Sequence, residues 1–285
     1  MPSQLIDIHP HIISADTNRY PISPLGGTRS RWSEERPVDF AGLVAGMDAA
    51  GIDKAAIVHS STTYGYDNSY LADAIVGHRG RFTGVFSVDV GAPDAVERIR
   101  HWVARGLSGL RLFAAGSTVK TDQAWIAAPA TYPAWRCCEE LDLPVAISMR
   151  LNGVPHLIDV LTRFPRVRIV LDHLMLTPIE DGPPYLASAG LFELAHYPNV
   201  FLKLTTNNVR RAHDGKSTPA SFFGRLVQDF GSARIAWGSN FPNETGTLAQ
   251  QVQEARTALA SLPAADLHNI FCRTAMALYP VLADR

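Results

Sequence analysis

The chain has 285 residues, 46% of them hydrophobic, and its charged side chains leave a net charge of -1. A chain of this length can bury a large core, and its near-neutral charge argues against nucleic acid or an anionic membrane surface as a partner. Its three cysteines include the adjacent pair Cys137 and Cys138 and give no disulfide framework, so we expect a reducing, cytoplasmic setting. No apolar run approaches the roughly 18 residues of a membrane-spanning helix, and the first apolar strand begins too early for a signal peptide. We expect one domain over residues 1–285.

Apolar runs and helical patterns alternate along the chain, beginning with a short apolar run at residues 5–11 and a long irregular segment at 12–37. Gly51 and Pro165 are typical helix terminators. The other predicted strands are 54–58, 82–90, 107–113, 144–149, 167–171, 200–204 and 233–237. The predicted helices are 38–50, 68–78, 94–104, 132–141, 154–164, 186–196, 221–230, 247–261 and 264–278.

Eight strands followed by helices, in a chain near the roughly 250 residues typical of the class, predict an α/β fold of the (β/α)8 type, a TIM barrel. A doubly wound open sheet is the alternative. It is disfavoured because Asp7-Ile8-His9-Pro10-His11 stands where a glycine-rich phosphate loop would follow the first strand.

Polar side chains follow nearly every predicted strand. In a (β/α)8 barrel these positions gather around one mouth, where such enzymes keep their chemistry. His9 and His11 are two residues apart, so they would project from the same face of the first strand. The candidate site residues are His9, His11, Tyr64, Arg111, Ser148, Arg150, His173, Thr205 and Asn240.

Several of these residues have an ordinary structural interpretation as well. Arg150 and Lys203 are equally compatible with surface charges, and Ser148 and Thr205 with hydrogen bonds to neighbouring backbone. His173 ends an apolar strand that should be buried on both faces, which favours an orientation toward the mouth.

Three motifs stand out: IDIHPH at residues 6–11, LDH at 171–173 and WGSNFP at 237–242. Together they resemble the amidohydrolase superfamily, in particular the amidohydrolase 2 group that includes pyrone-dicarboxylate lactonase, sugar lactonases and aromatic-acid decarboxylases. The resemblance implies that His9 and His11 are the family's first-strand pair and that His173 is its sixth-strand histidine. Asn240 stands where the family usually has an aspartate, and Ser148 and Arg150 stand where metal-using members have a fifth-strand histidine.

These departures have chemical consequences. An amide at position 240 cannot act as a base near neutral pH. Of the four ligands expected in metal-using members only two remain. Because zinc usually takes at least three protein ligands, we expect no tightly bound metal and no cofactor. The resemblance then implies a metal-independent mechanism, in which histidines polarise a carbonyl and Arg111 and Arg150 hold a substrate carboxylate.

The leading hypothesis is a hydrolase that acts on a lactone, or less readily an amide, of a small carboxylated or phenolic compound, with His173 as the evident base. The alternatives are a barrel that only binds a small acid, since a missing base is also typical of a lost activity, and a metal-assisted decarboxylase. The segment 12–37 is expected to cover the mouth. A homo-oligomer is compatible with the sequence.

Overall fold

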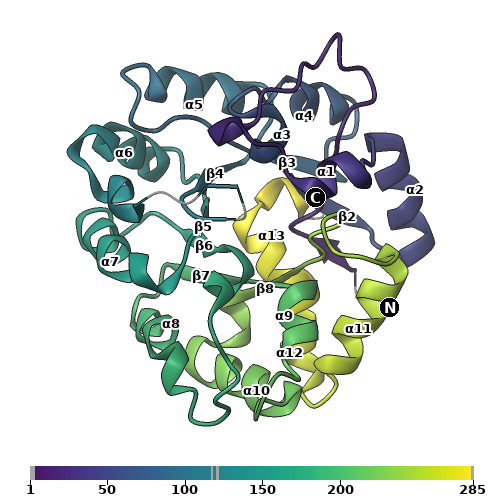
Figure 1. The fold of residues 1–285 in the computed structure, drawn as a ribbon, viewed down its shortest axis with the longest axis vertical. Helices are drawn as coiled ribbons and strands as arrows, with labels where there is room; N and C mark the ends of the chain where they lie inside the picture. Colours follow the sequence, from purple (N-terminus) through teal and green to yellow (C-terminus); the bar gives the residue numbers. More distant parts are fainter. Residues whose placement is uncertain (1–3, 117, 120–121, 284–285) are drawn as a thin grey trace.

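The computed structural model describes residues 4–116, 118–119 and 122–283, and its core is a barrel of eight parallel strands (Figure 1). The strands pair in chain order, and the Ile8 N–H donates a hydrogen bond of 3.2 Å to the Trp237 carbonyl, which joins the eighth strand back to the first. The predicted (β/α)8 fold is therefore confirmed. The strands are β1 (Ile6–Asp7), β2 (Lys54–Val58), β3 (Phe82–Phe86), β4 (Gly109–Phe113), β5 (Val145–Ser148), β6 (Ile169–Leu171), β7 (Val200–Thr205) and β8 (Ile235–Gly238).

Helices surround the barrel (Figure 1). They are α1 (Arg31–Glu35), α2 (Phe40–Ala50), α3 (Ser61–Tyr64), α4 (Ser69–Ala74), α5 (Ala95–Ala104), α6 (Tyr132–Glu140), α7 (Val154–Arg163), α8 (Ala189–Glu193), α9 (Thr206–Arg211), α10 (Pro219–Phe230), α11 (Leu248–Ala258), α12 (Ala264–His268) and α13 (Thr274–Leu278). Over the described ranges, none of these helices combines the length and apolar character needed to cross a membrane.

Most predicted elements lie where the sequence placed them, but several have different ends. The first strand stops at Asp7, so His9 and His11 lie beyond it, and the predicted strand 82–90 ends at Phe86. The predicted helix 186–196 is a short α-helix between two 3-10 turns, and the helix 264–278 contains a π-helical turn at Asn269–Arg273. Helix α9 was not predicted; the side chains of Thr205 and Asn208 form a capping box that starts it directly after β7.

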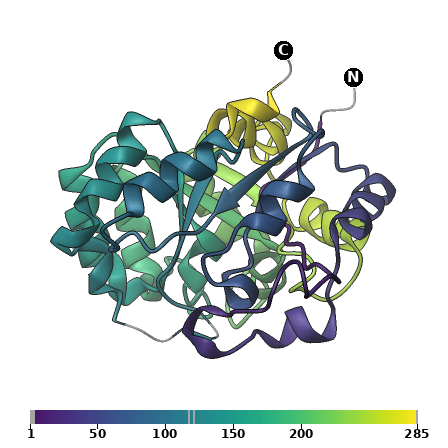
Figure 2. The same cartoon turned by 90° about the horizontal axis from the view of Figure 1, so that it is seen from above.

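The barrel interior is a small apolar core that the C-terminal segment closes. Inward-facing residues such as Ile8, Val58 and Val170 pack against Leu278 and Tyr279 of the chain's last helical region. Figure 2 shows this C-terminal region on one side of the barrel and the N-terminal segment that contains α1 on the other. One barrel end is thus filled by apolar contacts, and the end where the strands finish is left for polar groups.

Gly238, at the end of β8, lies against β1 so closely that a side chain has no room. A Cβ added there would lie 2.6 Å from the His9 Cβ and 3.0 Å from the His9 backbone nitrogen. The contact holds His9 and the residues after β8 in one arrangement, because neither backbone can move outward without breaking the bond between Ile8 and Trp237.

We predict that Gly238→Ala destabilises the protein by roughly 1–3 kcal/mol, because the added methyl overpacks the junction of β1 and β8. The measurement is the free energy of unfolding in urea. Gly224→Ala in α10 is the matched control: an added Cβ there meets nothing within 4 Å, and alanine in a helix interior should stabilise by about 0.5–1 kcal/mol. Equal effects of the two substitutions would contradict the close-packing argument.

Candidate active site

A cavity of about 230 Å³ opens where the strands end. Its walls mix aromatic and apolar groups with hydroxyls, amides, two imidazoles and two charged groups. The lining residues are His11, Trp32, Ser60, Thr62, Arg111, Phe113, Gly116, Ser148, His173, Leu176, Asn207, Asn240, Asn243 and Glu244. A concave site with a few convergent polar groups at this end of a barrel is the default position for an active site.

A buried charge cluster lies beneath this cavity, with the Asp172 carboxylate at its centre. Lys203 Nζ lies 2.8 Å from Asp172 Oδ1, and Arg111 Nε lies 3.1 Å from Asp172 Oδ2. The Lys203 and Asp172 side chains are fully buried, so Lys203 is not the surface charge that its sequence context also allowed. Burial raises the pKa of Asp172, but Lys203 and Arg111 outweigh it and hold the pKa of this carboxyl well below its usual range. The carboxylate stays ionised and fixes both cations.

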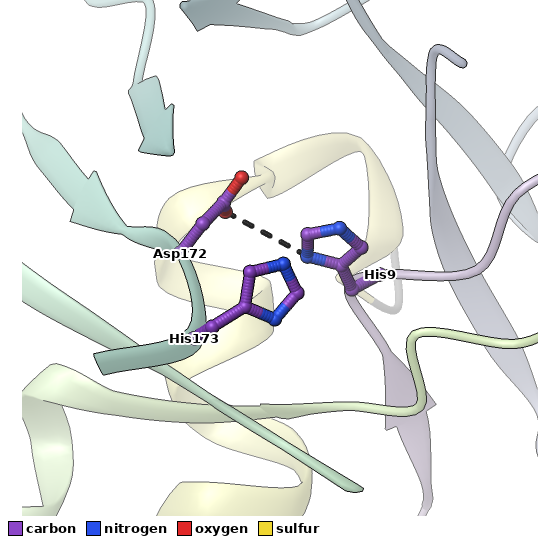
Figure 3. A group of neighbouring side chains, drawn as sticks. All are labelled: His9, Asp172 and His173. Atoms are coloured by element: carbon purple, nitrogen blue, oxygen red, sulfur yellow. Dashed lines mark ion pairs between the residues drawn. The ribbon is translucent and has the colours of Figure 1, made fainter. Parts of the chain in front are cut away.

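His9 packs directly on this cluster (Figure 3). Its Nδ1 lies 3.6 Å from Asp172 Oδ1, and its ring centroid lies 4.7 Å from that of His173 and 4.9 Å from that of His11. Burial, reinforced by Lys203, lowers the pKa of His9 well below that of a free imidazole, so the ring is neutral. His9 is fully buried and lies behind the other two histidines rather than in the cavity wall.

His11 lies at the cavity surface, between the barrel and α1. Its Nδ1 lies 2.8 Å from the Val58 carbonyl, which can only accept, so Nδ1 carries the proton and Nε2 keeps its lone pair. Burial and the neighbouring Arg111 lower the pKa of His11 to about 3, which leaves it neutral. The Trp32 ring stacks on His11 with a centroid distance of 5.1 Å. The segment 12–37 therefore reaches the cavity through Trp32, as the sequence led us to expect.

The tautomer of His173 is determined by two residues that follow β7. Its Nδ1 lies 3.0 Å from Thr205 Oγ1, and Thr205 Oγ1 donates its own proton to Asn208 Oδ1 at 3.0 Å. Thr205 therefore accepts from His173 Nδ1–H, and His173 Nε2 is left as an acceptor. Burial lowers the pKa of His173 to about 4, although Asp172 opposes the shift. His173 also has a positive φ of 54°, and Asn208 Nδ2 donates to its carbonyl at 2.9 Å.

Asn240 stands at the start of the loop after β8 and contacts a carboxylate that the sequence analysis did not single out. It has a positive φ of 60°, a conformation that asparagine tolerates better than most residues. Its Nδ2 donates to Glu244 Oε1 at 3.3 Å. Glu244 belongs to none of the three motifs. The sequence feature that could have identified it is its position four residues after Asn240, a predicted site residue.

The structure brings together five of the nine sequence-predicted site residues in the cavity wall: His11, Arg111, Ser148, His173 and Asn240. His9 lies behind them, and Thr205 is fully buried as the partner of His173. The other two, Tyr64 and Arg150, lie outside the wall. The Tyr64 hydroxyl accepts a hydrogen bond of 2.8 Å from the Ser14 N–H and so holds the segment 12–37.

Arg150 does not join Arg111 in a carboxylate clamp, which corrects the arrangement expected from the sequence. It lies two residues beyond the end of β5, as the N-cap of a 3-10 turn at Leu151–Gly153, and it is exposed. Arg111 itself is engaged by Asp172. The cavity therefore presents one guanidinium group, already balanced by a buried carboxylate.

Comparison with known proteins agrees with this geometry. A sequence model of the amidohydrolase family, Amidohydro_2, matches residues 6–281. The chain belongs to the amidohydrolase family. Its amidohydrolase relatives include L-fucono-1,5-lactonase of Burkholderia ambifaria, which is 30% identical over an alignment of 211 residues; the alignment covers 72% of this chain and 69% of that protein. The family resemblance drawn from the three motifs is confirmed.

Two solved structures with this amidohydrolase fold illustrate the similarity. A Pseudomonas putida protein assigned as a 2-pyrone-4,6-dicarboxylic acid hydrolase superposes with a TM-score of 0.79 at 20% identity, and the match covers all of both chains. An amidohydrolase of Burkholderia multivorans, solved with bound zinc, has a TM-score of 0.77 at 19% identity and covers 97% of this chain and 99% of its own. At these identities the likeness supports the fold alone.

The residues of this amidohydrolase do not fit a tightly held metal ion. His9, Asp172 and His173 offer ligand atoms within 4.8 Å of one another, and both ring nitrogens of His9 lack a hydrogen-bond partner. However, Asp172 Oδ1, the oxygen that faces His9, lies 2.8 Å from the Lys203 ammonium group. A dication bound there would lie within about 5 Å of that cation and be repelled by roughly 7 kcal/mol at an effective dielectric constant near 20. The neighbouring wall groups Ser148 and Asn240 add no negative charge.

We predict low metal content. Protein purified without added metal should carry far less than one equivalent of zinc or manganese by mass spectrometry of the metals. Treatment with a chelator should leave its melting temperature and activity unchanged. The prediction would be contradicted by one stoichiometric ion that is lost in His9→Ala together with thermal stability. The exposed His196→Ala is the control variant.

We also predict that acid destabilises the fold through the buried histidines. The pKa of His173 and of His59 is lowered by burial to about 4 and that of His11 to about 3. Since these pKa values lie below that of an unfolded histidine, the unfolded chain binds more protons, and stability present above about pH 6.5 is lost as the pH falls. Each of these histidines should lower the free energy of unfolding by roughly 1–2 kcal/mol when the pH falls from 7 to 5.

Asp7 opposes this trend, because burial raises its pKa to about 6 and the folded state then takes up a proton that the unfolded carboxylate does not. Between pH 7 and 5, Asp7 should offset about 1 kcal/mol of the stability that is lost through the histidines. Urea unfolding at several pH values gives the net slope. His59→Gln should reduce that slope by about one proton; a slope that does not change in this variant would show that His59 is not buried in its neutral form.

Proposed function

We propose that this amidohydrolase hydrolyses a lactone of a small, neutral, hydroxylated compound, without a metal. The observation that carries the proposal is the cavity in which one fixed guanidinium group, two neutral imidazoles and a ring of hydroxyl and amide groups face the same space. Family membership and the relationship to a sugar lactonase support it. An amide substrate is the less favoured variant, because its poorer leaving group needs stronger acid assistance.

Arg111 is the group best suited to hold the scissile carbonyl oxygen. Its guanidinium group lines the cavity and is fixed from behind by Asp172 at 3.1 Å. Negative charge that develops on the carbonyl oxygen would meet a cation that needs no reorganisation, which is the arrangement that stabilises transition states most strongly.

His11 and His173 take a different role from the one inferred from the sequence. Both hold their proton on Nδ1, so the Nε2 atoms accept hydrogen bonds and do not polarise a carbonyl. We assign them the orientation of the attacking water or of substrate hydroxyl groups. Asn240 can donate to the same ligand, and His9 and Thr205 keep the two rings in position.

We infer a neutral, hydroxylated substrate, in place of the carboxylated or phenolic compound expected from the sequence, on the basis of the cavity charges. The lining residues comprise one cation and one carboxylate, and each already has an ion-pair partner outside the wall, Asp172 and Arg210. Asn207 Oδ1 is buried without a hydrogen-bond partner and would accept from a hydroxyl. The Trp32 ring offers an apolar face to the carbon side of a sugar-like ring. Among the described residues that line the cavity, a dicarboxylate would meet no second free cation.

We propose a reducing compartment such as the cytoplasm for this activity, because the adjacent cysteines Cys137 and Cys138 are buried as free thiols. A homo-oligomer stays a prediction.

The test is a pH-stat assay with three substrate sets: neutral aldonolactones, a pyrone dicarboxylate and hydroxylated aromatic acids. We expect turnover of the first set, unaffected by chelator. Arg111→Lys should lower kcat by roughly 10²–10³-fold, because a single ammonium group cannot bond Asp172 and the carbonyl oxygen together. Arg150→Lys, the same change on an exposed residue outside the cavity, should have no effect. Carbon dioxide release from the aromatic acids would favour a decarboxylase, and saturable binding without turnover would favour a binding protein.

A further inference from the structure

Lactone hydrolysis needs a group that takes the proton from the attacking water, and Asn240 cannot be that group. An amide nitrogen or carbonyl does not accept a proton near neutral pH. Among the described residues that line the cavity, Glu244 is the single carboxylate. It lies four residues after Asn240 in the same loop, and its side chain is only 17% exposed.

The surroundings of Glu244 hold its two oxygens in different ways. Asn240 Nδ2 donates to Oε1 at 3.3 Å, and Arg210 Nη1 of α9 lies 3.5 Å from Oε2. The Glu244 backbone is fixed as well: its N–H donates to the Asn240 carbonyl, and its own carbonyl accepts from Gln251 Nε2 at 3.2 Å. Gln251 is fully buried in α11. The carboxylate is therefore presented to the cavity by a rigid loop and keeps acceptor capacity beyond its two partners.

Glu244 also differs from the two imidazoles in proton affinity. Burial raises its pKa above the ordinary value, and Arg210, Asn240 and Arg36 oppose this shift while Glu254 adds to it. The pKa of His173 is lowered to about 4 and that of His11 to about 3. The shift makes the Glu244 carboxylate a better proton acceptor than an ordinary glutamate, whereas burial makes both imidazoles poorer proton acceptors than an ordinary histidine.

We propose that Glu244 is the catalytic general base of the lactonase reaction, held toward the attacking water by Asn240 and Arg210. This inference rests on the proposed function. It changes the assignment made from the sequence, where His173 was the evident base, and it gives Asn240 a positioning role.

The reaction begins with the attack of water on the lactone carbonyl. Water oxygen bonds to the lactone carbonyl carbon while one water proton passes to the Glu244 carboxylate, and the carbonyl electron pair moves to the oxygen that faces Arg111. When the tetrahedral adduct collapses, the bond between the former carbonyl carbon and the ring oxygen breaks. The ring oxygen takes the proton back from Glu244, and the product is the open hydroxy acid.

The test is Glu244→Gln, which keeps the size of the side chain and its contact with Arg210. We expect kcat on an aldonolactone to fall by roughly 10²–10⁴-fold, the contribution typical of a positioned general base, with KM little changed. The acidic limb of the rate profile should disappear. Glu254→Gln is the matched control, because Glu254 pairs with the same Arg210 at 2.9 Å yet does not line the cavity. Its kcat should equal that of the wild type, and its acidic limb should persist and move to lower pH, because the charge of Glu254 helps to raise the pKa of Glu244.

Asn240→Asp gives a second readout that a purely structural glutamate would not produce. It puts a second carboxylate in contact with Glu244, so the acidic limb should move to higher pH. An active Glu244→Gln enzyme with an unchanged acidic limb would overturn the inference while leaving the lactonase function standing. A wild type that hydrolyses no lactone would overturn both.

Discussion

The sharing of one buried carboxylate by two cations is the constraint on which the site depends. Asp172 binds Lys203 of β7 and Arg111 of β4, so three neighbouring regions of the barrel meet at one charge. Buried ion pairs of this kind gain little stability over apolar packing, but loss of one partner costs roughly 3–5 kcal/mol because it leaves an uncompensated charge. The main effect of the cluster is to fix the positions of the side chains that form it. It holds a guanidinium group at the cavity floor in one orientation.

The same cluster sets the chemistry of the histidines around it. Burial is the main reason that His9, His11 and His173 are neutral, and the nearby cations lower their pKa further. The neutral rings of His11 and His173, whose Nδ1 protons are already engaged, cannot donate a hydrogen bond to a substrate carbonyl. In the proposed mechanism the roles follow from charge: the Arg111 guanidinium group binds developing negative charge, the two rings accept hydrogen bonds, and proton transfer falls to the Glu244 carboxylate in the cavity wall.

The sequence predicted the barrel because alternation and helical periodicity are local signals, and it predicted the mouth residues because the topology gathers strand ends. It did not predict the pairing of Asp172 with Lys203, since Asp172 lies just after β6 and Lys203 within β7, and the inward direction of both side chains depends on strand register. It missed α9, because the polar run Thr205–Asn208 looks like a loop until its side chains cap each other. Glu244 was missed because its distance to Asn240 is set by the positive φ of a loop residue and not by any pattern.

Trp32 belongs to α1, in the long segment between β1 and α2, and not to the barrel. Trp32, which would contact the apolar face of the substrate, therefore lies in a different part of the sequence from the residues that would carry out the reaction. Loops tolerate insertion and exchange far better than packed strands. Changes within residues 12–37 can then alter which ring the cavity accepts while the charge cluster and the catalytic geometry persist, so substrate range and chemistry are free to evolve at different rates in this chain.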